Sequence, residues 1–571
     1  MKKQKNYPFD KVAPLADLHD LLDRAASEAG DRIAYKYFEG KDVHERTFAQ
    51  FRLETIWLGT ALASIGYTGG HAACIGENSY RWIVAYLTIL NSDGVFVPVD
   101  RELTESDMLN VLNSSDSDLL FVGGSYEKLI PVIREKTGIR RFISLDAEED
   151  SEDGVLSLRR LMDRGRELYE AGDTGYTSQR SDRHTLKLLV YTSGTTGVAK
   201  GVMLSEHNLV SMVYYGLQVS GVYDVGLSVL PYHHTYESVA GLLVAMHNHS
   251  TLCINDKLRN IQKNMQLFRP HYIYVVPAIA EAFYKKIWAN IEAKGKTKTV
   301  NRLIKLSRAL LACGIDVRRK LFKTIHDSFG GRLIKVVCGG APIRPEIGRF
   351  FGDLGIYLCN GYGITECSPL ISANRDRFND YSTVGVVLPC LEFKIEPDGD
   401  EEYGEICVKG DTVMLGYYKN PEETAKAIVD GWFHTGDYGM INEHGQVTIT
   451  GRKKNIIVLS NGKNIYPEEI ESLIMNIPYV SEVVVSAEKA EDGSEVGLCA
   501  EAFLDAEKLS ESGIDKPFEA LKHDIAAICR QLPVYKQITN VKLRDTEFEK
   551  TSSRKIRRFA SAAKPAAQTQ A

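Results

Sequence analysis

The segment 191–202 holds the residues that are best suited to binding a phosphate. It reads Tyr-Thr-Ser-Gly-Thr-Thr-Gly-Val-Ala-Lys-Gly-Val and follows a short apolar run, 186–191, that is typical of a buried strand. Glycines allow the backbone to approach a phosphate closely, and backbone N–H groups in such a loop form an anion-binding concavity. Lys200 adds a positive charge, but Gly201 follows it, so the loop is not a Walker A loop. A flexible linker is the alternative, but a linker does not require this order of residues between two strands.

Further groups suited to chemistry stand in short motifs along the chain. The motifs are Pro231-Tyr-His-His-Thr-Tyr-Glu237, Gly339-Gly-Ala-Pro342, Asn360-Gly-Tyr-Gly-Ile-Thr-Glu366, Gly404-Glu-Ile406, His434-Thr-Gly-Asp437, Gly451-Arg-Lys-Lys454 and 551–557. Glu366 offers hard oxygen ligands of the kind that Mg²⁺ prefers. Adjacent histidines in an extended segment point apart, which disfavours a metal site at 233–234. Taken alone, Glu366 or Asp437 would more often be a solvated surface carboxylate.

Short apolar runs alternate with helical patterns around these motifs. We expect strands at 186–191, 227–230, 271–276, 332–338 and 356–359, and helices at 277–288 and 345–351. This alternation predicts an α/β fold with a mostly parallel sheet. Ligands on such sheets bind at the loops that follow the strand ends. The polar stretch 146–182 is expected to be a surface excursion.

A second unit is expected to begin near Gly451. A strand at 455–459, a turn at 460–462, a helix at 467–475, strands at 483–486 and 498–503 and a helix at 517–532 form an α+β pattern of roughly 120 residues, a normal domain size. The predicted domains are therefore 1–451 and 452–560. Residues 561–571, rich in Ala and Gln, are expected to be a disordered tail.

Composition narrows the class of protein. The chain has 571 residues, which predicts two or more domains, and a net charge of −6, which gives no general attraction to nucleic acid. Its ten cysteines include no CxxC pair, so a disulfide scaffold or a zinc site of that type is not expected. The N-terminus lacks a signal-peptide pattern, and the apolar stretches are too short to span a bilayer. We expect a cytoplasmic protein.

Together, these motifs and their order resemble the adenylate-forming superfamily, which contains acyl-CoA synthetases, peptide-synthetase adenylation domains and beetle luciferases. The resemblance implies a large N-terminal AMP- and acyl-binding domain with mostly parallel sheets and flanking helices, plus a small mobile α+β C-terminal domain. The motif at 77–82 and the insertion between Phe283 and Gly330 look most similar to bacterial long-chain fatty-acid–CoA ligases.

The resemblance implies a reaction in two steps. ATP and Mg²⁺ activate a carboxylic acid as an acyl-adenylate with release of pyrophosphate, and coenzyme A then takes the acyl group. The implied catalytic residues are Thr196, His234, Glu366 and Lys555, with Thr192 and Glu366 as metal ligands. The implied nucleotide-binding residues are Thr192, Ser193, Gly194, Thr195, Thr196, Gly197, Lys200, Gly340, Ala341, Asn360, Gly361, Tyr362, Gly363, Thr365, Asp437, Arg452 and Lys555.

The small domain is implied to rotate between the half-reactions, with Lys454 at the hinge and Gly462 on the thiol tunnel. His234 is implied to gate entry of the thiol. The chain departs from the family pattern around Lys555, where Arg554 replaces the usual glycine and Glu549 the usual proline. A merely basic tail is the alternative there, and an Asn-Gly turn is the plainer interpretation of Gly462.

The substrate is expected to be a long-chain fatty acid. Thr235 stands where amino-acid-activating relatives carry an aspartate, and a buried ammonium without a partner would be costly. Acyl-AMP ligases of this superfamily that load carrier proteins usually have an insertion before the hinge. The interval between Glu405 and Asp437 is short here, so the resemblance implies coenzyme A as the acceptor. The alternatives are an aryl-acid or carrier-protein ligase of the same superfamily, and a catalytically idle nucleotide-binding homologue.

The segment 285–323 is strongly basic. It contains twelve Lys and Arg residues against Glu292 and Asp316, a local charge of +10. Basic residues and leucines alternate around 302–311 in a helical pattern that can lie at a membrane surface. We expect either peripheral contact with the inner face of a membrane or a helix packed on its own domain with a solvated charged face.

Overall fold

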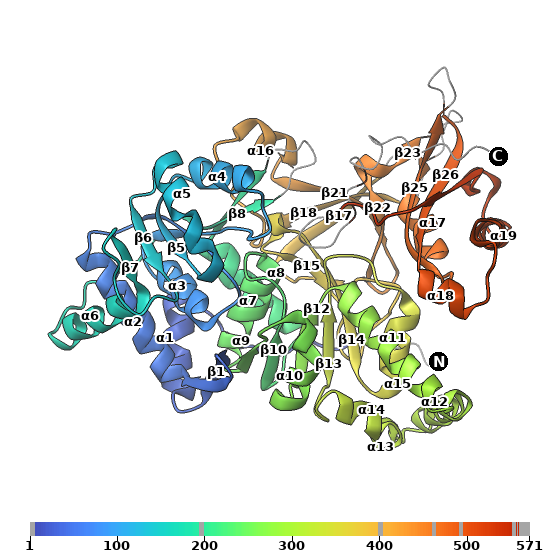
Figure 1. Ribbon diagram of the computed structural model, residues 1–571, viewed down its shortest axis with the longest axis horizontal. Helices are drawn as coiled ribbons and strands as arrows, with labels where there is room; N and C mark the ends of the chain where they lie inside the picture. The colour runs from blue at the N-terminus through green and yellow to red at the C-terminus, as the bar shows by residue number, and fades with distance from the viewer. Residues whose placement is uncertain are drawn as a thin grey trace. The chain divides into compact units, whose positions relative to one another are not determined.

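The computed structural model describes residues 6–192, 199–397, 403–458, 464–489, 495–550, 556 and 558. The chain forms two compact units, and several segments alternate between them (Figure 1). The first unit takes Met1–Phe393, Val408–Phe433 and Glu443–Val447, and the second takes Lys394–Cys407, His434–Asn442 and Thr448–Ala571. A large unit and a smaller unit of mixed α/β structure confirm the predicted fold class. The predicted domain boundary between residues 451 and 452 stays a prediction.

The first unit contains an eight-stranded sheet of order β19-β9-β8-β4-β3-β5-β6-β7. Its strands are β3 Gly70–Ile75, β4 Gly94–Pro98, β5 Ser117–Val122, β6 Arg141–Ser144, β7 Val155–Ser157, β8 Leu186–Thr192, β9 Lys200–Ser205 and β19 Gly416–Tyr417. The strands from β8 to β7 are parallel, and β9 and β19 extend one edge antiparallel. Leu119 to Val122 are fully buried, as parallel strands covered on both faces require.

The same unit contains a nine-stranded sheet of order β16-β15-β14-β13-β12-β10-β11-β1-β2. Its strands are β1 Ile33–Glu39, β2 Asp42–Thr47, β10 Val225–Ser228, β11 Thr251–Ile254, β12 Tyr272–Val275, β13 Lys335–Cys338, β14 Tyr357–Gly363, β15 Leu370–Ala373 and β16 Val386–Val387. The six central strands are parallel and the outer ones antiparallel. The Gly339 and Gly361 motifs therefore lie at the carboxyl ends of adjacent strands.

Helices cover these sheets, and their starts follow from local sequence. Side chains of Thr47, Ser79 and Ser205 each accept a hydrogen bond from a backbone N–H in the first turn, which caps α2, α3 and α7. The helices of this unit are α1 Leu18–Ala29, α2 Phe48–Ser64, α3 Tyr80–Leu90, α4 Glu105–Ser114, α5 Ile130–Lys136, α6 Leu158–Glu170, α7 Glu206–Val219, α8 Thr235–Glu237, α9 Val244–His247, α10 Ile261–Phe268, α11 Pro277–Ala293, α12 Thr297–Ala312, α13 Arg318–Leu321, α14 Lys323–Ser328, α15 Pro345–Leu354 and α16 Pro421–Ala427.

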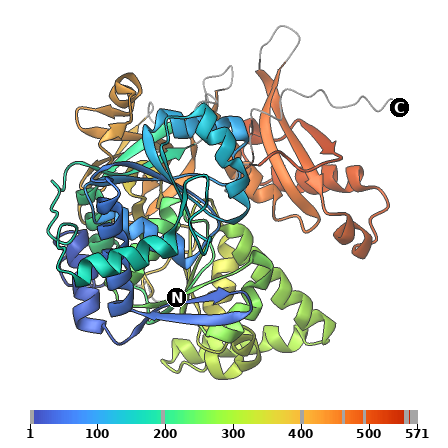
Figure 2. The same cartoon turned by 60° about the vertical axis from the view of Figure 1, so that its left-hand side comes forward.

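The remaining strands form smaller sheets, and most of their residues belong to the second unit. A five-stranded sheet joins β17 Leu391–Pro397, β18 Gly404–Gly410, β21 Trp432–Ile441 and β20 Ile428–Val429 in that order, with β22 Val447–Arg452 paired to β21. The remaining elements are β23 Ile457–Val458, β24 Asn464–Ile465, α17 Pro467–Ile474, β25 Val480–Lys489, β26 Glu495–Leu504, α18 Ala506–Glu511, α19 Pro517–Cys529 and β27 Asn540–Arg544. The antiparallel pair β25–β26 forms a long ribbon (orange in Figure 2).

Most predicted elements are present, and the differences concern their ends. The strand predicted at 332–338 begins only at Lys335, because Arg319 binds the carbonyls of Gly331 and Leu333 at 3.0 and 2.9 Å. The strand predicted at 227–230 is β10, two residues earlier, because the Leu230 carbonyl accepts a hydrogen bond from Asn78 Nδ2 at 2.6 Å.

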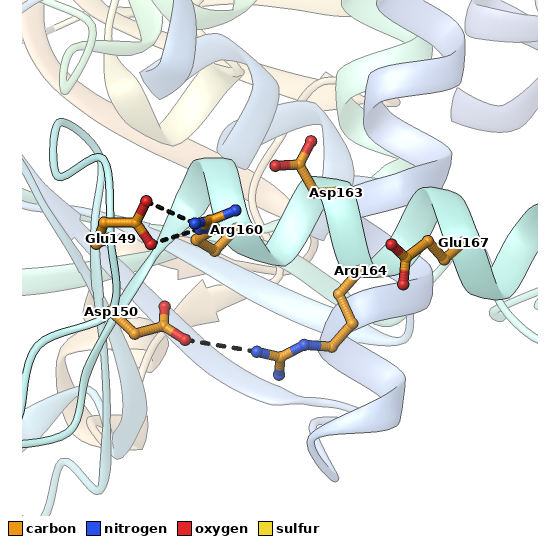
Figure 3. Close-up of a pocket in the computed structure, with 6 residues that line it drawn as sticks. All are labelled: Glu149, Asp150, Arg160, Asp163, Arg164 and Glu167. Carbon is orange, nitrogen blue, oxygen red and sulfur yellow. Dashed lines mark hydrogen bonds and ion pairs between the residues drawn. The ribbon is translucent and has the colours of Figure 1, made fainter.

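The segment expected to be a surface excursion contains β7 and α6. One face of α6 is polar: Arg160 forms a bidentate ion pair with Glu149 at 2.6 Å, and Arg164 lies 3.5 Å from Asp150 (Figure 3). The opposite face packs on α2, where Gly165 lies against the backbone of Trp57. Both arginines that line the polar hollow on α6 are thus already paired with carboxylates, so neither is open to an anionic ligand.

Candidate functional site

The phosphate-loop motif connects two strands that pair with each other. Thr192 at the end of β8 lies opposite Lys200 at the start of β9 in the antiparallel ladder. The ends of the loop are therefore fixed by backbone pairing. Predicted loop residues Ser193, Gly194, Thr195, Thr196 and Gly197 lie outside the described residues.

Tyr417 links Lys200 to the candidate magnesium ligand Glu366. Its hydroxyl donates a 2.9 Å hydrogen bond to Glu366 Oε1, and Lys200 Nζ lies 5.1 Å from the centre of its ring. Lys200 Nζ also forms an ion pair with Glu423, and this hydrogen bond lowers the pKa of Glu423 to about 2. Burial raises the pKa of Tyr417, and the negative charge of Glu366 raises it further. The fold thus gathers a cation and a carboxylate that are far apart in sequence.

Glu366 occupies a short 3₁₀ turn, Thr365–Cys367, directly after β14. Its backbone carbonyl accepts a 2.8 Å hydrogen bond from Met414 N, which holds this turn against the segment that leads to Tyr417. Thr192 and Glu366 supply hydroxyl and carboxylate oxygens, the donor set that Mg²⁺ prefers. The residues present therefore fit the ion that the sequence predicts.

A narrow apolar cavity lies beside the Gly339 and Gly361 motifs. Its volume is about 90 Å³. It is lined by Met212, Gly216, Ser220, Tyr236, Ala240, Val244, Tyr274, Val337, Gly339, Gly340, Gly361, Tyr362, Gly363, Pro369, Leu370 and Ala373. The wall thus includes four predicted nucleotide-site residues: Gly340, Gly361, Tyr362 and Gly363. The remaining wall is mostly aromatic and aliphatic, which suits an apolar group.

Close approach requires glycine at Gly363 of this cavity, and backbone conformation favours glycine at Gly340. A Cβ at Gly363 would lie 1.8 Å from the Pro369 carbonyl oxygen, and one at Gly339 would lie 3.3 Å from the Gly361 carbonyl oxygen. Gly340 has a φ of +87°, in the region that disfavours other residues. Ala341 follows it. Beside them, the buried side-chain oxygen of Asn360 has no hydrogen-bond partner among the described residues, so it can receive an amino donor such as that of adenine.

The paired histidines lead into an irregular helix. His234 precedes α8, and its carbonyl accepts hydrogen bonds from the backbone N–H groups of Glu237 and Ser238 at 3.0 Å. A π-helix, Ser238–Leu243, continues from there and places Ala240 on the cavity. His233 Nε2 lies 3.3 Å from Asp100, and burial lowers the pKa of His233.

Asn78 holds the start of this histidine segment. Its side-chain amide donates to the Leu230 carbonyl at 2.6 Å, and its oxygen accepts from Tyr232 N at 3.1 Å. The 77–82 motif thus positions the loop that precedes His234.

The remaining described motif residues belong to the second unit. Asp437 on β21 is buried, and its Oδ1 lies 2.9 Å from Arg452 Nε at the end of β22. Lys454 lies in the short 3₁₀ turn Lys453–Asn455, where burial and then the Arg452 charge lower its pKa. Asp437 and Arg452, both predicted to bind the nucleotide, are thus in direct contact.

Glu405 of the Gly404 motif supports the neighbouring segments. Its carboxylate accepts hydrogen bonds from Lys453 Nζ at 2.7 Å and from Gly436 N at 3.1 Å. Burial alone would raise the pKa of Glu405, but the Lys453 hydrogen bond and charge hold it below its usual value.

Lys555 and Gly462 lie outside the described residues. The chain on either side of Lys555 is anchored within the second unit. Lys550 pairs with Ile556 in an antiparallel bridge, and Arg558 lies 3.4 Å from Glu468.

Sequence reasoning missed three supporting residues: Tyr417, Asn78 and Glu237. Tyr417 is the first of two consecutive tyrosines that follow Gly416, between the motifs that begin at Gly404 and His434. This position between two motifs is the signal that could have indicated Tyr417. Asn78 stands inside a recognised motif, but its partner lies 152 positions away. Glu237 closes the histidine motif and is buried against Ser228.

A family model described as "AMP-binding enzyme" matches residues 22–418, and one described as "AMP-binding enzyme C-terminal domain" matches 454–569. The chain belongs to the AMP-binding enzyme family, which confirms the resemblance that its motifs predicted.

Relatives and solved structures agree with this assignment. The chain is 28% identical over 572 residues to a long-chain-fatty-acid–CoA ligase of Escherichia coli O6:H1, covering 95% of this chain and 93% of the relative. It is 27% identical over 543 residues to the chloroplastic long-chain-fatty-acid–[acyl-carrier-protein] ligase AEE15 of Arabidopsis thaliana, covering 82% and 74%. The crystal structure of the anthranilate CoA ligase AuaEII with anthranoyl-AMP superposes with a TM-score of 0.77 at 20% identity, covering 97% and 98% of the chains.

Proposed function

We propose that this protein activates a long-chain fatty acid with ATP and transfers the acyl group to coenzyme A. The apolar cavity beside the Gly340 and Gly361–Gly363 motifs carries the proposal, because it adjoins residues predicted to bind nucleotide and offers an acyl chain a wall of Tyr, Val, Leu and Met side chains. Its ~90 Å³ is less than the ~300–1,000 Å³ of typical ligand pockets, so a long chain requires flexible side chains such as Met212 to move.

In the proposed reaction, the main task of the protein is to neutralise negative charge, and not to form covalent bonds with the substrate. A carboxylate oxygen attacks the α-phosphorus, the bond to the bridging oxygen breaks, and pyrophosphate leaves. A preorganised site with Lys200, Lys555 and Mg²⁺ held by Glu366 and Thr192 would offset the repulsion between the two anions. In the second step the thiol sulfur attacks the acyl carbon and AMP leaves.

Coenzyme A is the acceptor that we propose, and a carrier protein is the alternative. The two relatives described above carry names with different acceptors, CoA and an acyl-carrier protein. The interval between Glu405 and Asp437 consists of β18, β19, α16, β20 and β21 with short connections, so it has no additional domain that would receive a carrier protein.

A substrate panel tests both parts of the proposal. Pyrophosphate release is measured with acids of increasing chain length and with an aryl acid, each with coenzyme A, with acyl-carrier protein and with neither. We expect the largest kcat/KM with long-chain acids and coenzyme A. Faster turnover of benzoate-type acids, or a requirement for the carrier protein, would contradict the proposal.

We also propose that this protein, expected to be cytoplasmic, contacts anionic membranes peripherally through α12. Val300, Ile304 and Ser307 are buried, while Leu306 is 49% exposed on the outer face. Arg302 and Lys305 are exposed there too, and no ion pair involves either within the described part of the chain. Figure 2 shows α11–α15 gathered in one helical group (yellow-green). No helix in the described ranges is long and apolar enough to cross a bilayer.

Some of the twelve basic residues of 285–323 form ion pairs within the fold. Arg308 binds Asp353 at 2.6 and 2.7 Å, and Arg318 binds Asp316, so these charges are compensated within the fold. Arg302 and Lys305 are the charges that we assign to the membrane, at about 1 kcal/mol for each basic residue near an anionic surface.

Vesicle sedimentation tests the membrane contact. We expect binding to anionic but not neutral vesicles at 0.1 M salt, and loss of binding at 1 M salt, where the Debye length falls from ~10 to ~3 Å. Arg302→Glu with Lys305→Glu should abolish binding and leave turnover of a soluble short-chain acid unchanged. Lys257→Glu, which changes a charge outside the segment, serves as the control. Equal sedimentation of wild type and double variant would overturn this assignment.

A further inference from the structure

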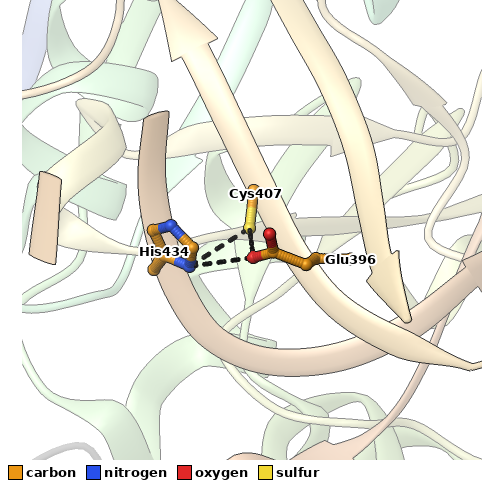
Figure 4. A group of neighbouring side chains, drawn as sticks. All are labelled: Glu396, Cys407 and His434. Atoms are coloured by element: carbon orange, nitrogen blue, oxygen red, sulfur yellow. Dashed lines mark hydrogen bonds and ion pairs between the residues drawn. The ribbon is translucent and has the colours of Figure 1, made fainter. Parts of the chain in front are cut away.

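Three neighbouring strands of the second unit bring a thiol, an imidazole and a carboxylate together. Glu396 lies on β17, Cys407 on β18 and His434 on β21, which are adjacent in the sheet. Figure 4 shows the three side chains converging on one point from these strands. The group is separate from the predicted magnesium ligands, which belong to the first unit.

The contact between the imidazole and the carboxylate is long for a hydrogen bond. Cys407 Sγ lies 3.4 Å from His434 Nδ1 and 3.7 Å from Glu396 Oε2, and His434 Nδ1 lies 3.5 Å from Glu396 Oε2. Hydrogen bonds from nitrogen to oxygen are most often about 2.9–3.0 Å long. The 3.5 Å contact between His434 Nδ1 and Glu396 Oε2 is therefore long and weak as a hydrogen bond, whereas the two contacts of the Cys407 sulfur have ordinary lengths for sulfur.

The same distances agree with the spacing of ligand atoms around a tetrahedral zinc ion. Zinc lies about 2.3 Å from cysteine sulfur and about 2.0–2.2 Å from histidine nitrogen or carboxylate oxygen. At tetrahedral angles those bond lengths place neighbouring ligand atoms roughly 3.3–3.6 Å apart. All three measured distances lie within or close to this range, without movement of the backbone.

The number of acceptors around His434 Nδ1 also agrees with a bound cation. Its Nδ1 also lies 3.4 Å from Glu405 Oε2, so a single nitrogen faces one sulfur and two carboxylate oxygens. One N–H can point at only one of these acceptors, whereas a divalent cation is attracted to all of them. Glu405 is already bonded by Lys453 and by Gly436 N, which places it beside the group as a support or a fourth ligand.

We propose that Cys407, His434 and Glu396 form a zinc-binding site. A thiolate with an imidazole and a carboxylate selects Zn²⁺ over Mg²⁺, which prefers oxygen ligands only. The Cys407 thiol is buried and Glu396 is 48% exposed, so an ion enters from the Glu396 side. Zinc joins three strands at the start of the His434–Asp437 motif and thereby fixes the strand that carries Asp437.

Metal titration tests the site directly. The full-length chain, without a metal-binding tag and stripped with a chelator, is titrated with Zn²⁺ in competition with a chromogenic chelator. We expect one equivalent to bind, and millimolar Mg²⁺ not to displace it. Co²⁺ should give a thiolate-to-metal charge-transfer band, which reports directly on the cysteine ligand.

Variants identify the ligands. Cys407→Ser and Glu396→Gln are close in shape to the native residues, and each should weaken zinc binding at least about tenfold, since even loss of an outer partner of a ligand costs ~10–100-fold. Cys313→Ser, which removes an exposed cysteine elsewhere, is the matched control and should bind like wild type. Absence of zinc binding, or equal affinity in wild type and both ligand variants, would overturn the site. A cobalt band that persists in Cys407→Ser would overturn it as well.

Discussion

Glu237 is a fully buried carboxyl group at the end of the histidine motif. Its Oε1 accepts a hydrogen bond from Ser228, and its Oε2 has no hydrogen-bond partner within the described residues. Burial raises the pKa of Glu237 to about 8, so the group is mostly neutral at pH 7. The folded state therefore binds a proton that the unfolded state releases above its ordinary pKa.

This protonation predicts a pH dependence of stability. A raised pKa in the folded state contributes stability that is full below the unfolded pKa and is lost as the pH rises through about 8. Relative to Glu237→Gln, the wild type should lose about 1 kcal/mol of unfolding free energy per pH unit between pH 5.5 and 7.5. Denaturant unfolding of both proteins at several pH values measures this difference. Parallel pH profiles would show that Glu237 is ionised in the folded protein.

Tyr417 is a positioning residue for Glu366. Tyr417→Phe keeps the ring near Lys200 but removes the hydrogen bond to the Glu366 carboxylate, an interaction of about 1.5–3 kcal/mol for a charged acceptor. We expect kcat/KM for ATP to fall about tenfold or more and the Mg²⁺ concentration needed for half-maximal rate to rise. Tyr418→Phe, which loses only a bond to exposed Asp116, is the control and should retain wild-type kinetics. An unchanged Mg²⁺ requirement in Tyr417→Phe would exclude this role.

Site residues within one motif could be predicted from sequence, because the chemistry and the spacing stand together there. Gly340 and the 361–363 segment do line one cavity, as their positions after adjacent strands indicated. Tyr417 could not be predicted to hold Glu366, because the contact joins residues 51 positions apart through β19 and the 3₁₀ turn. Such pairings depend on sheet order, which periodicity does not determine.

The crossing of α2 and α6 depends on one glycine. A Cβ at Gly165 would lie 1.8 Å from the Trp57 carbonyl oxygen, so Gly165→Ala forces the helices apart. Alanine gains about 1 kcal/mol in helix propensity, but overpacking costs about 1–3 kcal/mol, and a backbone clash lies at the upper end. We expect a net loss of about 1–2 kcal/mol in unfolding free energy, measured by denaturant titration.

Gly138→Ala is the matched control for this helix crossing. No heavy atom lies within 4 Å of the added Cβ, and its backbone has an ordinary φ. Its stability should change by less than about 0.5 kcal/mol. Equal effects of the two substitutions would show that α6 does not pack closely on α2.

Elements with strong periodicity were predictable, and those set by tertiary contacts were not. Helices α11, α15 and α17 begin at a proline, which marks a first helical turn in the sequence itself. Helix α6 was hidden because its polar residues dominate the segment, and only its packing on α2 reveals the apolar face. Strand ends such as Lys335 depend on distant side chains that take the neighbouring carbonyls.

At the scale of the whole molecule, we expect that the two half-reactions can be separated. Lys454→Pro restricts both its own φ and the conformation of Lys453 in the turn after β22. Acyl-adenylate formation should persist in this variant while thioester formation is lost, as measured in separate half-reaction assays. Lys454→Ala leaves the backbone free and should retain both steps. Wild-type thioester rates in Lys454→Pro would contradict alternation about this residue.

Lys555→Ala should give the opposite pattern. Loss of a preorganised charge-stabilising donor costs about 10²–10³ in rate, so acyl-adenylate formation should fall by that factor. Thioester formation from supplied acyl-adenylate should survive. An equal fall in both half-reactions would indicate damage to the fold instead of the assigned role, despite the neighbouring Arg554.

Detection of the acyl-adenylate tests the central claim most directly. The protein is incubated with ATP, Mg²⁺ and a long-chain fatty acid without coenzyme A, and the bound products are identified by mass spectrometry and by trapping with hydroxylamine. We expect acyl-AMP and pyrophosphate in equal amounts, and conversion of the acyl-AMP to acyl-CoA and AMP when coenzyme A is added. Formation of ADP and phosphate, or nucleotide binding without acyl-AMP, would contradict it.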